Sequence, residues 1–259
     1  MNCREFMDKI EQMCPLGAAC EWDNPGLIAG DTDAQIHNVM IALDATDEVI
    51  DAAITQHVDM LVTHHPLIFG NISKVNTGDI VGKRLVKLIS NGINCYAAHT
   101  NFDVKAMASL AASMLGLEAP EVLEVTSVCD GVPEGIGRVS DVYESSAMTW
   151  INKLKASFEL QNVIVYGDTD KIVKRVAISP GSGKGMLANA LEKNVDLLIT
   201  GDIGHHDGID AIEAGITLVD AGHYGLEYIF IDYMARYIER ECSDVRVYTC
   251  KAGIPFKIV

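Results

Sequence analysis

Histidine and carboxylate side chains recur in this sequence directly after short apolar runs. The residues concerned are His64, His65, Asp103, His223 and Glu227. Imidazole nitrogens and carboxylate oxygens are common ligands of divalent transition metals in proteins. In parallel α/β sheets, binding residues gather where strands end, because the loops there leave the core. The pattern therefore predicts a centre that holds a pair of divalent cations.

The spacing of these side chains favours two cations over one. Neighbouring residues of an extended segment point in opposite directions, so His64 and His65 are expected to serve one ion each. His223 and Glu227 are four residues apart and would share one face of a helix that begins at His223. A carboxylate can bridge two cations, which makes Glu227 the candidate bridge. Asp103 would then complete the ion on the His65 side.

Each of these residues also has an ordinary structural explanation. Asp103 alone could cap the helix that carries residues 105–115, and Glu227 alone could lie on a solvated helix face. The metal interpretation is favoured because chance would otherwise have to place potential ligands at three separate strand ends. A role as hydrogen-bonded core residues is preferred for three other histidines: His57, His205 and His206.

His99 is the candidate catalytic residue. An internal repeat aligns the pattern His99-x3-Asp103 with His223-x3-Glu227, which argues that His99 lies near the centre. It could be a ligand, a proton carrier or a residue that orients Asp103. We favour the orienting or proton-transferring role.

The elements that must position these side chains come from the same duplication. Residues 38–43 and 59–63 recur as residues 175–180 and 196–200, at a constant offset of 137 positions. A helical stretch follows the first strand of each copy. Two related units, each alternating strands with helices, are the simplest explanation.

The fold class follows from the apolar, β-branched strands, which show little alternation and are expected to be covered on both faces. Helices are predicted between them at residues 47–56, 81–91, 186–193 and 206–214. Such alternation predicts an α/β protein made of two related, interlinked α/β lobes with mainly parallel sheets.

The two lobes are assigned by residue range. The first spans residues 1–125 and is joined by the C-terminal segment 220–259, whereas the second spans residues 126–219. The stretch 121–138 is rich in Val, Glu, Gly and Pro and is interpreted as a connection. The C-terminal segment must return to the first lobe if His223 and Glu227 share a site with His64.

A glycine-rich segment at residues 179–185 resembles a phosphate-binding loop but fails the required spacing. We interpret it as a tight turn, with anion binding by its backbone N–H groups as the alternative. Gly201 and Asp202 stand where the repeat would place His64 and His65. The second copy has therefore lost those ligands, and one asymmetric centre is expected.

Composition narrows the class of protein. Apolar residues make up 49% and charged residues 22% of 259 residues, which is ordinary for a globular chain. The formal net charge of -16 argues against nucleic-acid binding, because phosphate contacts need clustered Lys and Arg. No stretch approaches 18 uninterrupted apolar residues, so no membrane span is expected.

The seven cysteines include no C-x-x-C pair and are odd in number. Free thiols in a reducing cytosol explain them better than a disulfide framework. Cys14 and Cys20 are a minor alternative as metal ligands. The N-terminus reads as an amphipathic helix, with no secretory apolar core, so a cytoplasmic protein is expected.

Several of these segments together resemble a known family. They are W-D-N-P-G-L at 22–27, T-H-H-P at 63–66, H-T-N-F-D at 99–103, T-G-D at 200–202 and G-H-Y-G-L-E at 222–227. In this order they resemble the family named for a yeast NGG-interacting factor, also called the GTP cyclohydrolase 1 type 2 homolog family. The resemblance covers nearly the whole chain and indicates the short form, without the middle domain of some members.

The resemblance implies two interlinked α/β lobes with a dinuclear divalent-metal centre, and a toroidal homohexamer built from trimers. It implies that His64 and His223 bind one ion, that His65 and Asp103 bind the other, and that Glu227 bridges them. All five residue types are present. Gly225 is a departure, since a small hydroxyl residue is common there, and it touches the surroundings of the ligands rather than the ligands themselves.

Three functions are compared. The first is a metal-dependent hydrolase acting on a nucleotide-like or cyclic-amide substrate, which the family name suggests is GTP. The second is a non-enzymatic metal-binding protein that serves in metal insertion, buffering or regulation. The third, a ring threaded by DNA, conflicts with the acidic charge. His and carboxylate ligands suit Zn, Fe, Mn, Co or Ni, so the metal is left open.

Overall fold

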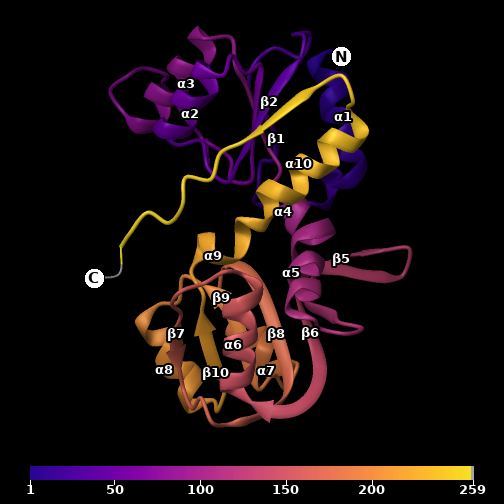
Figure 1. Cartoon of the computed structure of the whole chain (residues 1–259), viewed down its shortest axis with the longest axis vertical. Helices are drawn as coiled ribbons and strands as arrows, with labels where there is room; N and C mark the ends of the chain where they lie inside the picture. The colour runs from indigo at the N-terminus through magenta and orange to yellow at the C-terminus, as the bar shows by residue number, and fades with distance from the viewer. Residues whose placement is uncertain (258–259) are drawn as a thin grey trace. The chain divides into compact units, whose positions relative to one another are not determined.

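The computed structural model describes residues 1–257 and divides the chain into two compact units. The first unit combines Met1–Phe102 with the segment from Tyr228 onward, and the second is Asp103–Glu227. In Figure 1 the first unit contains the indigo N-terminal part together with the yellow C-terminal segment. The α/β fold class is confirmed. The two boundaries lie between residues 102 and 103 and between residues 227 and 228. Residues 121–129 pair within the second sheet.

The first unit is built on a five-stranded sheet in the order β1-β4-β3-β2-β11. Its central pairs are parallel, and β1 alone runs antiparallel to its neighbour β4. The strands are β1 (Gly26–Ala29), β2 (Asn38–Ala42), β3 (Met60–Thr63), β4 (Asn94–Ala97) and β11 (Arg246–Thr249). The helical segments are α1 (Cys3–Met13), η1 (Leu16–Ala18), α2 (Asp47–Thr55), α3 (Ile80–Ser90), α4 (Thr100–Phe102) and α10 (Ile229–Glu241).

Both faces of this first sheet are covered, as its apolar strands predict. Met40 and Leu61 belong to a core cluster shared with Val49 of α2 and Leu88 of α3. Because side chains alternate along a strand, the fully buried Ile41 lies on the opposite face. The central strands therefore carry apolar residues on both faces.

The second unit contains a six-stranded sheet in the order β5-β6-β8-β9-β10-β7. Its central strands are parallel, and antiparallel strands are added on both sides. The strands are β5 (Glu121–Cys129), β6 (Val132–Ser146), β7 (Ile164–Tyr166), β8 (Ile172–Ser182), β9 (Leu197–Gly201) and β10 (Thr217–Asp220). The helical segments are η2 (Asp103–Met107), α5 (Ala108–Leu115), α6 (Ala147–Ser157), α7 (Met186–Glu192), α8 (His205–Glu213) and α9 (His223–Glu227).

The stretch interpreted from sequence as a connection is in fact the β5–β6 hairpin, so that prediction is wrong. Asp130 and Gly131 form its turn with φ values of 51° and 79°. An Asp-Gly pair between apolar runs is a strong hairpin signal, because both residues tolerate positive φ. Figure 1 shows the end of this hairpin projecting from the second unit.

The internal duplication is visible at the level of single hydrogen bonds. Asp59 Oδ2 accepts hydrogen bonds at 2.8 Å from the backbone N–H groups of residues 37 and 38. Asp196 Oδ2 accepts the equivalent pair from residues 174 and 175, at 2.8 and 3.1 Å. The strand register repeats as well, since Val39 pairs with Met60 as Val176 pairs with Leu197. Each copy thus begins its parallel strands with the same aspartate clamp.

Among the helices within residues 1–257, none has both the length and the apolar character needed to cross a membrane.

Candidate metal centre

Three imidazoles of the first unit gather at the carboxyl ends of β3 and β4. His64 and His65 follow the last residue of β3, and His99 follows β4 by two residues. One possible ligand atom from each of the three lies within 4.8 Å of the others, so this group could hold a metal ion. The ring centroids are 4.9 Å apart for His64–His65, 5.2 Å for His64–His99 and 5.6 Å for His65–His99.

The expectation that His64 and His65 point in opposite directions is wrong. It assumed that the strand continues through both residues, whereas β3 ends at Thr63 and the chain bends at both histidines. Alternation of side chains holds only within extended backbone. Because the backbone bends here instead of staying extended, both rings belong to one group.

Every one of these imidazoles uses its Nδ1 atom for a hydrogen bond to an oxygen. His64 Nδ1 donates to the backbone carbonyl of Ala98 at 2.8 Å. His65 Nδ1 lies 2.8 Å from Asp44 Oδ1, and His99 Nδ1 lies 2.9 Å from Asp23 Oδ1. These acceptors fix the proton on Nδ1, so the neutral ring presents its lone pair at Nε2. This is how proteins orient histidines for a metal.

Asp23 is the most strongly anchored of these acceptors. Its buried carboxylate accepts hydrogen bonds from the Thr100 hydroxyl at 2.6 Å and from the Thr100 backbone N–H at 3.0 Å. Burial alone would raise the pKa of Asp23, but the hydrogen bonds from His99 and Thr100 outweigh it and lower the pKa to about 2. Asp23 therefore stays ionised near neutral pH and holds His99 in one orientation.

The second unit supplies an imidazole and a carboxylate on one helical turn. α9 begins at His223, as predicted, and His223 Nε2 lies 3.0 Å from Glu227 Oε2. His223 Nδ1 lies 2.8 Å from Asp202 Oδ2, so the ring is held between two carboxylates. Glu227 is buried. A buried carboxylate beside an oriented imidazole is a pair that suits a cation.

Asp103 opens η2, a π-helical segment that continues directly into α5. It is not the N-cap of that helix, because the cap position is Met107 and no side chain caps it. A π-helical turn inserts an extra residue and is frequent at functional sites. The alternative explanation of Asp103 as a capping residue is therefore wrong.

Glycines surround the His223–Glu227 pair for steric reasons. A Cβ on Gly181, whose φ is +83°, would overlap the Glu227 carboxylate. A Cβ on Gly201 would overlap the backbone of residues 222 and 223. Since Gly201 occupies the repeat position of His64, the second copy has no room for a histidine there. The glycine-rich segment thus lies against the candidate ligands of its own unit.

Sequence reasoning missed the three aspartates that orient the histidines, namely Asp23, Asp44 and Asp202. Asp202 was seen only as a lost ligand, yet it occupies the repeat position of His65 and orients His223 instead. It does so with a φ of 54°, a conformation that non-glycine residues adopt rarely and that is enriched at functional sites. A carboxylate just past a strand was the available signal.

The remaining sequence candidates lie elsewhere. His57, His205 and His206 are exposed, so their interpretation as core residues is wrong. Within residues 1–257, no cysteine belongs to a group that could hold a metal. Cys14 is buried, and burial raises the pKa of its thiol to about 12, which removes its thiolate at neutral pH. Cys14 is therefore a poor ligand.

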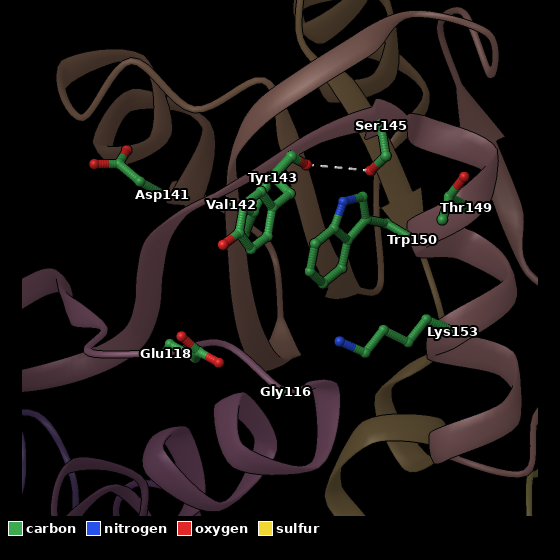
Figure 2. A pocket seen from close by; sticks show the side chains of 9 residues that line it. All are labelled: Gly116, Glu118, Asp141, Val142, Tyr143, Ser145, Thr149, Trp150 and Lys153. Carbon is green, nitrogen blue, oxygen red and sulfur yellow. Dashed lines mark hydrogen bonds between the residues drawn. The ribbon is translucent and has the colours of Figure 1, made fainter.

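A separate cavity of about 560 Å³ lies in the second unit. It contains none of the residues predicted from the sequence. Figure 2 shows Trp150 with the Lys153 side chain beside it and Tyr143 across from it. The Lys153 ammonium lies 4.6 Å from the centroid of the Trp150 ring. This cation–π contact stabilises the α6 face that forms one wall of the cavity.

Comparison with known proteins gives a consistent result. The sequence model of the family described as Duf34/NIF3 (NGG1p interacting factor 3) matches residues 1–253. Proteins named GTP cyclohydrolase 1 type 2 homolog are similar. The one from Clostridium acetobutylicum is 35% identical over 243 residues, covering 92% of this chain and 90% of its own. The one from Clostridium perfringens is 33% identical over 264 residues, covering all of both chains.

Solved structures share the fold over the full length. A Staphylococcus aureus protein superimposes with a TM-score of 0.88 and 26% sequence identity, covering 100% of this chain and 99% of the other.

Proposed function

Since this chain belongs to the Duf34/NIF3 family, we propose that it binds two divalent cations and uses them to hydrolyse a nucleotide-like or cyclic-amide substrate. In this proposal His64 and His223 hold one cation, His65 and Asp103 hold the other, and Glu227 bridges them. The ligands suit Zn, Fe, Mn, Co or Ni. The name GTP cyclohydrolase 1 type 2 homolog, carried by relatives, points to GTP as the first substrate to test.

The observation that carries the proposal is the common state of the imidazoles. His64, His65 and His223 each place Nδ1 within 2.8 Å of an oxygen, which is how proteins orient metal-binding histidines. A histidine that served only as a hydrogen-bonded core residue would have no need for this uniform arrangement. The donor set therefore fits divalent cations.

Chain connectivity supports the assignment of the carboxylates. In the first unit the His64 ring lies 6.2 Å from the Phe102 ring and 5.2 Å from the Phe230 ring, measured between centroids. Asp103 is the next residue after Phe102, and Glu227 lies three residues before Phe230. Three residues span at most about 11 Å. Both carboxylates are thus tethered to the surroundings of His64 by the chain itself.

A pair of divalent cations held there would polarise the scissile bond and lower the pKa of a bound water. The chain supplies the rest. Asp23 keeps His99 oriented, and His99 belongs to the same group as His64 and His65. We propose that His99 transfers the proton that the attacking water loses to the leaving group.

Metal analysis tests the binding part. Protein purified without added metal, then loaded with zinc or manganese and desalted, should contain two ions per chain by mass spectrometry of the elements. His65→Ala and His223→Ala should each lose about one ion. His37→Ala and His206→Ala remove exposed imidazoles outside the group and should keep both. Full metal content in His65→Ala and His223→Ala would contradict the assignment.

Turnover tests the hydrolytic part. The metal-loaded protein should hydrolyse at least one member of a panel of nucleotides, phosphoesters and cyclic amides. His99→Ala should retain both ions and lose turnover. His65→Ala should lose about one ion and also lose turnover. A fully loaded protein that is inactive on the whole panel would contradict the hydrolase.

The second function is a non-enzymatic metal-binding protein that serves in insertion, buffering or regulation. The net charge of -16 suits it as well as it suits the hydrolase, because an acidic surface raises the local concentration of cations. Metal exchange distinguishes the two functions. Release of both ions to an apo-acceptor within minutes would support a carrier, whereas retention over hours would support a catalytic centre.

We also propose that the protein assembles as a homohexamer, as the family resemblance implies. Native mass spectrometry should then give a species of six times the 28.0 kDa chain mass. A monomer or dimer at micromolar concentration would contradict this proposal.

A further inference from the structure

We propose that Trp22 and Phe69 form a stacking surface for a flat heteroaromatic ring of the substrate, next to the histidine group of the first unit. The inference rests on the proposed function, because it names the chemical class that the site selects. It assigns a specificity role to two residues that are not candidate ligands. Both rings are apolar and lie close to His99.

The first observation is the exposure of two large aromatic side chains beside a polar site. Trp22 is 70% exposed and Phe69 is 61% exposed. Burying a large apolar side chain lowers the free energy, so such exposure beside functional groups often marks a binding surface. The other tryptophan, Trp150, is only 8% exposed.

The second observation is their geometry around His99. The centroid of the Trp22 ring lies 5.9 Å from that of His99, with an interplanar angle of 76°. The Phe69 ring lies at the same distance, with an angle of 86°. The steep angles show that neither ring is stacked on the His99 imidazole. His64 and His65 also lie within 6 Å of His99.

The third observation is that the two aromatic segments are anchored. Asp23, the neighbour of Trp22, is bound by both His99 and Thr100. Asn24 Nδ2 donates a hydrogen bond of 3.0 Å to the Ile68 carbonyl, which joins the Trp22 segment to the residue before Phe69. The backbone on both sides is therefore positioned before any ligand arrives. Preorganisation of this kind increases affinity because less entropy is lost on binding.

The chemistry of this surface selects a planar ring. Every nucleobase or similar heterocycle has a π face, so any of them can stack on an aromatic side chain. The polar edge of such a ring could then face the imidazoles, where the scissile bond would be polarised. A sugar phosphate lacks the π face and would gain nothing from Trp22 or Phe69.

Tryptophan fluorescence tests the proposal directly. Trp150→Phe leaves Trp22 as the only tryptophan of the chain, since the sequence holds two. In the metal-loaded full-length protein, guanosine monophosphate should quench this emission in a saturable way, and ribose 5-phosphate should not. Phe69→Ala should weaken guanosine monophosphate binding about tenfold, the scale of one lost stacking contact.

Matched variants separate stacking from a general structural effect. Phe69→Tyr keeps the π face and should restore binding. Phe256→Ala removes another exposed phenylalanine and should leave binding unchanged. Metal content is measured on every sample, so a failure of the metal centre is recognised independently of a failure of stacking.

Three results would overturn the inference. One is a protein with both cations bound whose Trp22 emission does not respond to guanosine monophosphate. Another is equal quenching by ribose 5-phosphate, which would assign recognition to the phosphate or sugar. The last is a Trp22 emission that is already blue-shifted and shielded from acrylamide without ligand, which would mean that another copy of the chain covers the ring.

Discussion

At the scale of single residues, the tautomer of each candidate metal-binding histidine depends on the oxygen that its Nδ1 atom contacts. His64 is bound by a carbonyl, which can only accept, so its tautomer is fixed whatever the surroundings. His65 and His223 are bound by Asp44 and Asp202 instead. A carboxylate adds negative charge and makes Nε2 a stronger donor to a cation. In the proposed metal centre the aspartates would therefore contribute to affinity without contacting the cations.

This arrangement predicts the effect of removing one aspartate. Asp44→Ala or Asp202→Ala should lower the affinity for one of the two cations about 10- to 100-fold. Competition with a fluorescent zinc chelator measures the change. Asp47→Ala is the control, because Asp47 pairs with Lys83 and Arg84 at the surface. Unchanged affinity in both aspartate variants would show that the histidines orient themselves.

A steric prediction concerns Gly181. Gly181→Ala should destabilise the protein and expel metal, because the new Cβ would overlap the Glu227 carboxylate. The positive φ adds about 1 kcal/mol of strain. Gly215→Ala is matched to it, since φ is +77° there and nothing lies within 4 Å. Thermal unfolding and metal content should separate the two variants. Equal behaviour would mean that Glu227 can move away at no cost.

A prediction on pH concerns the buried thiols Cys14 and Cys95. Burial raises the pKa of each from 9.0 to about 12. A raised pKa contributes stability that is complete below pH 9 and is lost as the pH rises toward 12. At pH 10 each thiol should lower the free energy of unfolding by about 1 kcal/mol relative to pH 7. Urea unfolding at several pH values measures it, and Cys95→Ala should flatten the slope. If the pH dependence of unfolding were the same in Cys95→Ala as in the original protein, the prediction would be refuted.

At the scale of elements, both copies of the duplicated unit rely on one aspartate at the start of their parallel strands. Asp59 and Asp196 each accept two backbone N–H groups from the neighbouring strand. Without the carboxylate, these donors would lose their partners at the point where the strand pair begins. The clamp therefore sets the register from which the ligand-bearing strand ends follow.

The clamp predicts matched losses of stability. Asp59→Ala and Asp196→Ala should each lower the unfolding free energy by about 2 kcal/mol, the value of a hydrogen bond to a charged group. Asp210→Ala removes an exposed acid of α8 and should change it little. Chemical denaturation measures all three. A large effect in one copy only would mean that the two clamps are not equivalent.

The elements also show what the sequence could reveal. The constant offset of the repeat and the apolar strands were sufficient for the α/β class and for helices such as α2, found at Asp47–Thr55 against a predicted 47–56. Local patterning could not reveal that β5 and β6 add antiparallel strands, because pairing depends on distant residues. It also missed the bend at His64, since the end of a strand is decided by the surrounding loops. Ligand types were readable, whereas their orienting partners, such as Asp23, were not.

At the scale of the whole molecule, the proposed centre draws ligands from two compact units of one chain. The metal-free protein should then unfold in two transitions, and cations should merge and raise them. Binding to the native state alone adds about 2.7 kcal/mol at a concentration one hundred times Kd. Calorimetry with chelator and with manganese measures the change. A rise confined to one transition would show that the cations belong to one unit.

The second unit interrupts the first between Phe102 and Tyr228, and the Phe102 and Phe230 rings are only 4.9 Å apart. The second unit is thus inserted into the first, although the repeated segments themselves follow one another along the chain. A gene in which codon 102 is ligated to codon 228 through a short glycine bridge would encode the outer unit alone, with all three of its clustered imidazoles. Such a miniature would carry His64 and His65 without the other three proposed ligands, a starting point for recombination in evolution or in protein engineering.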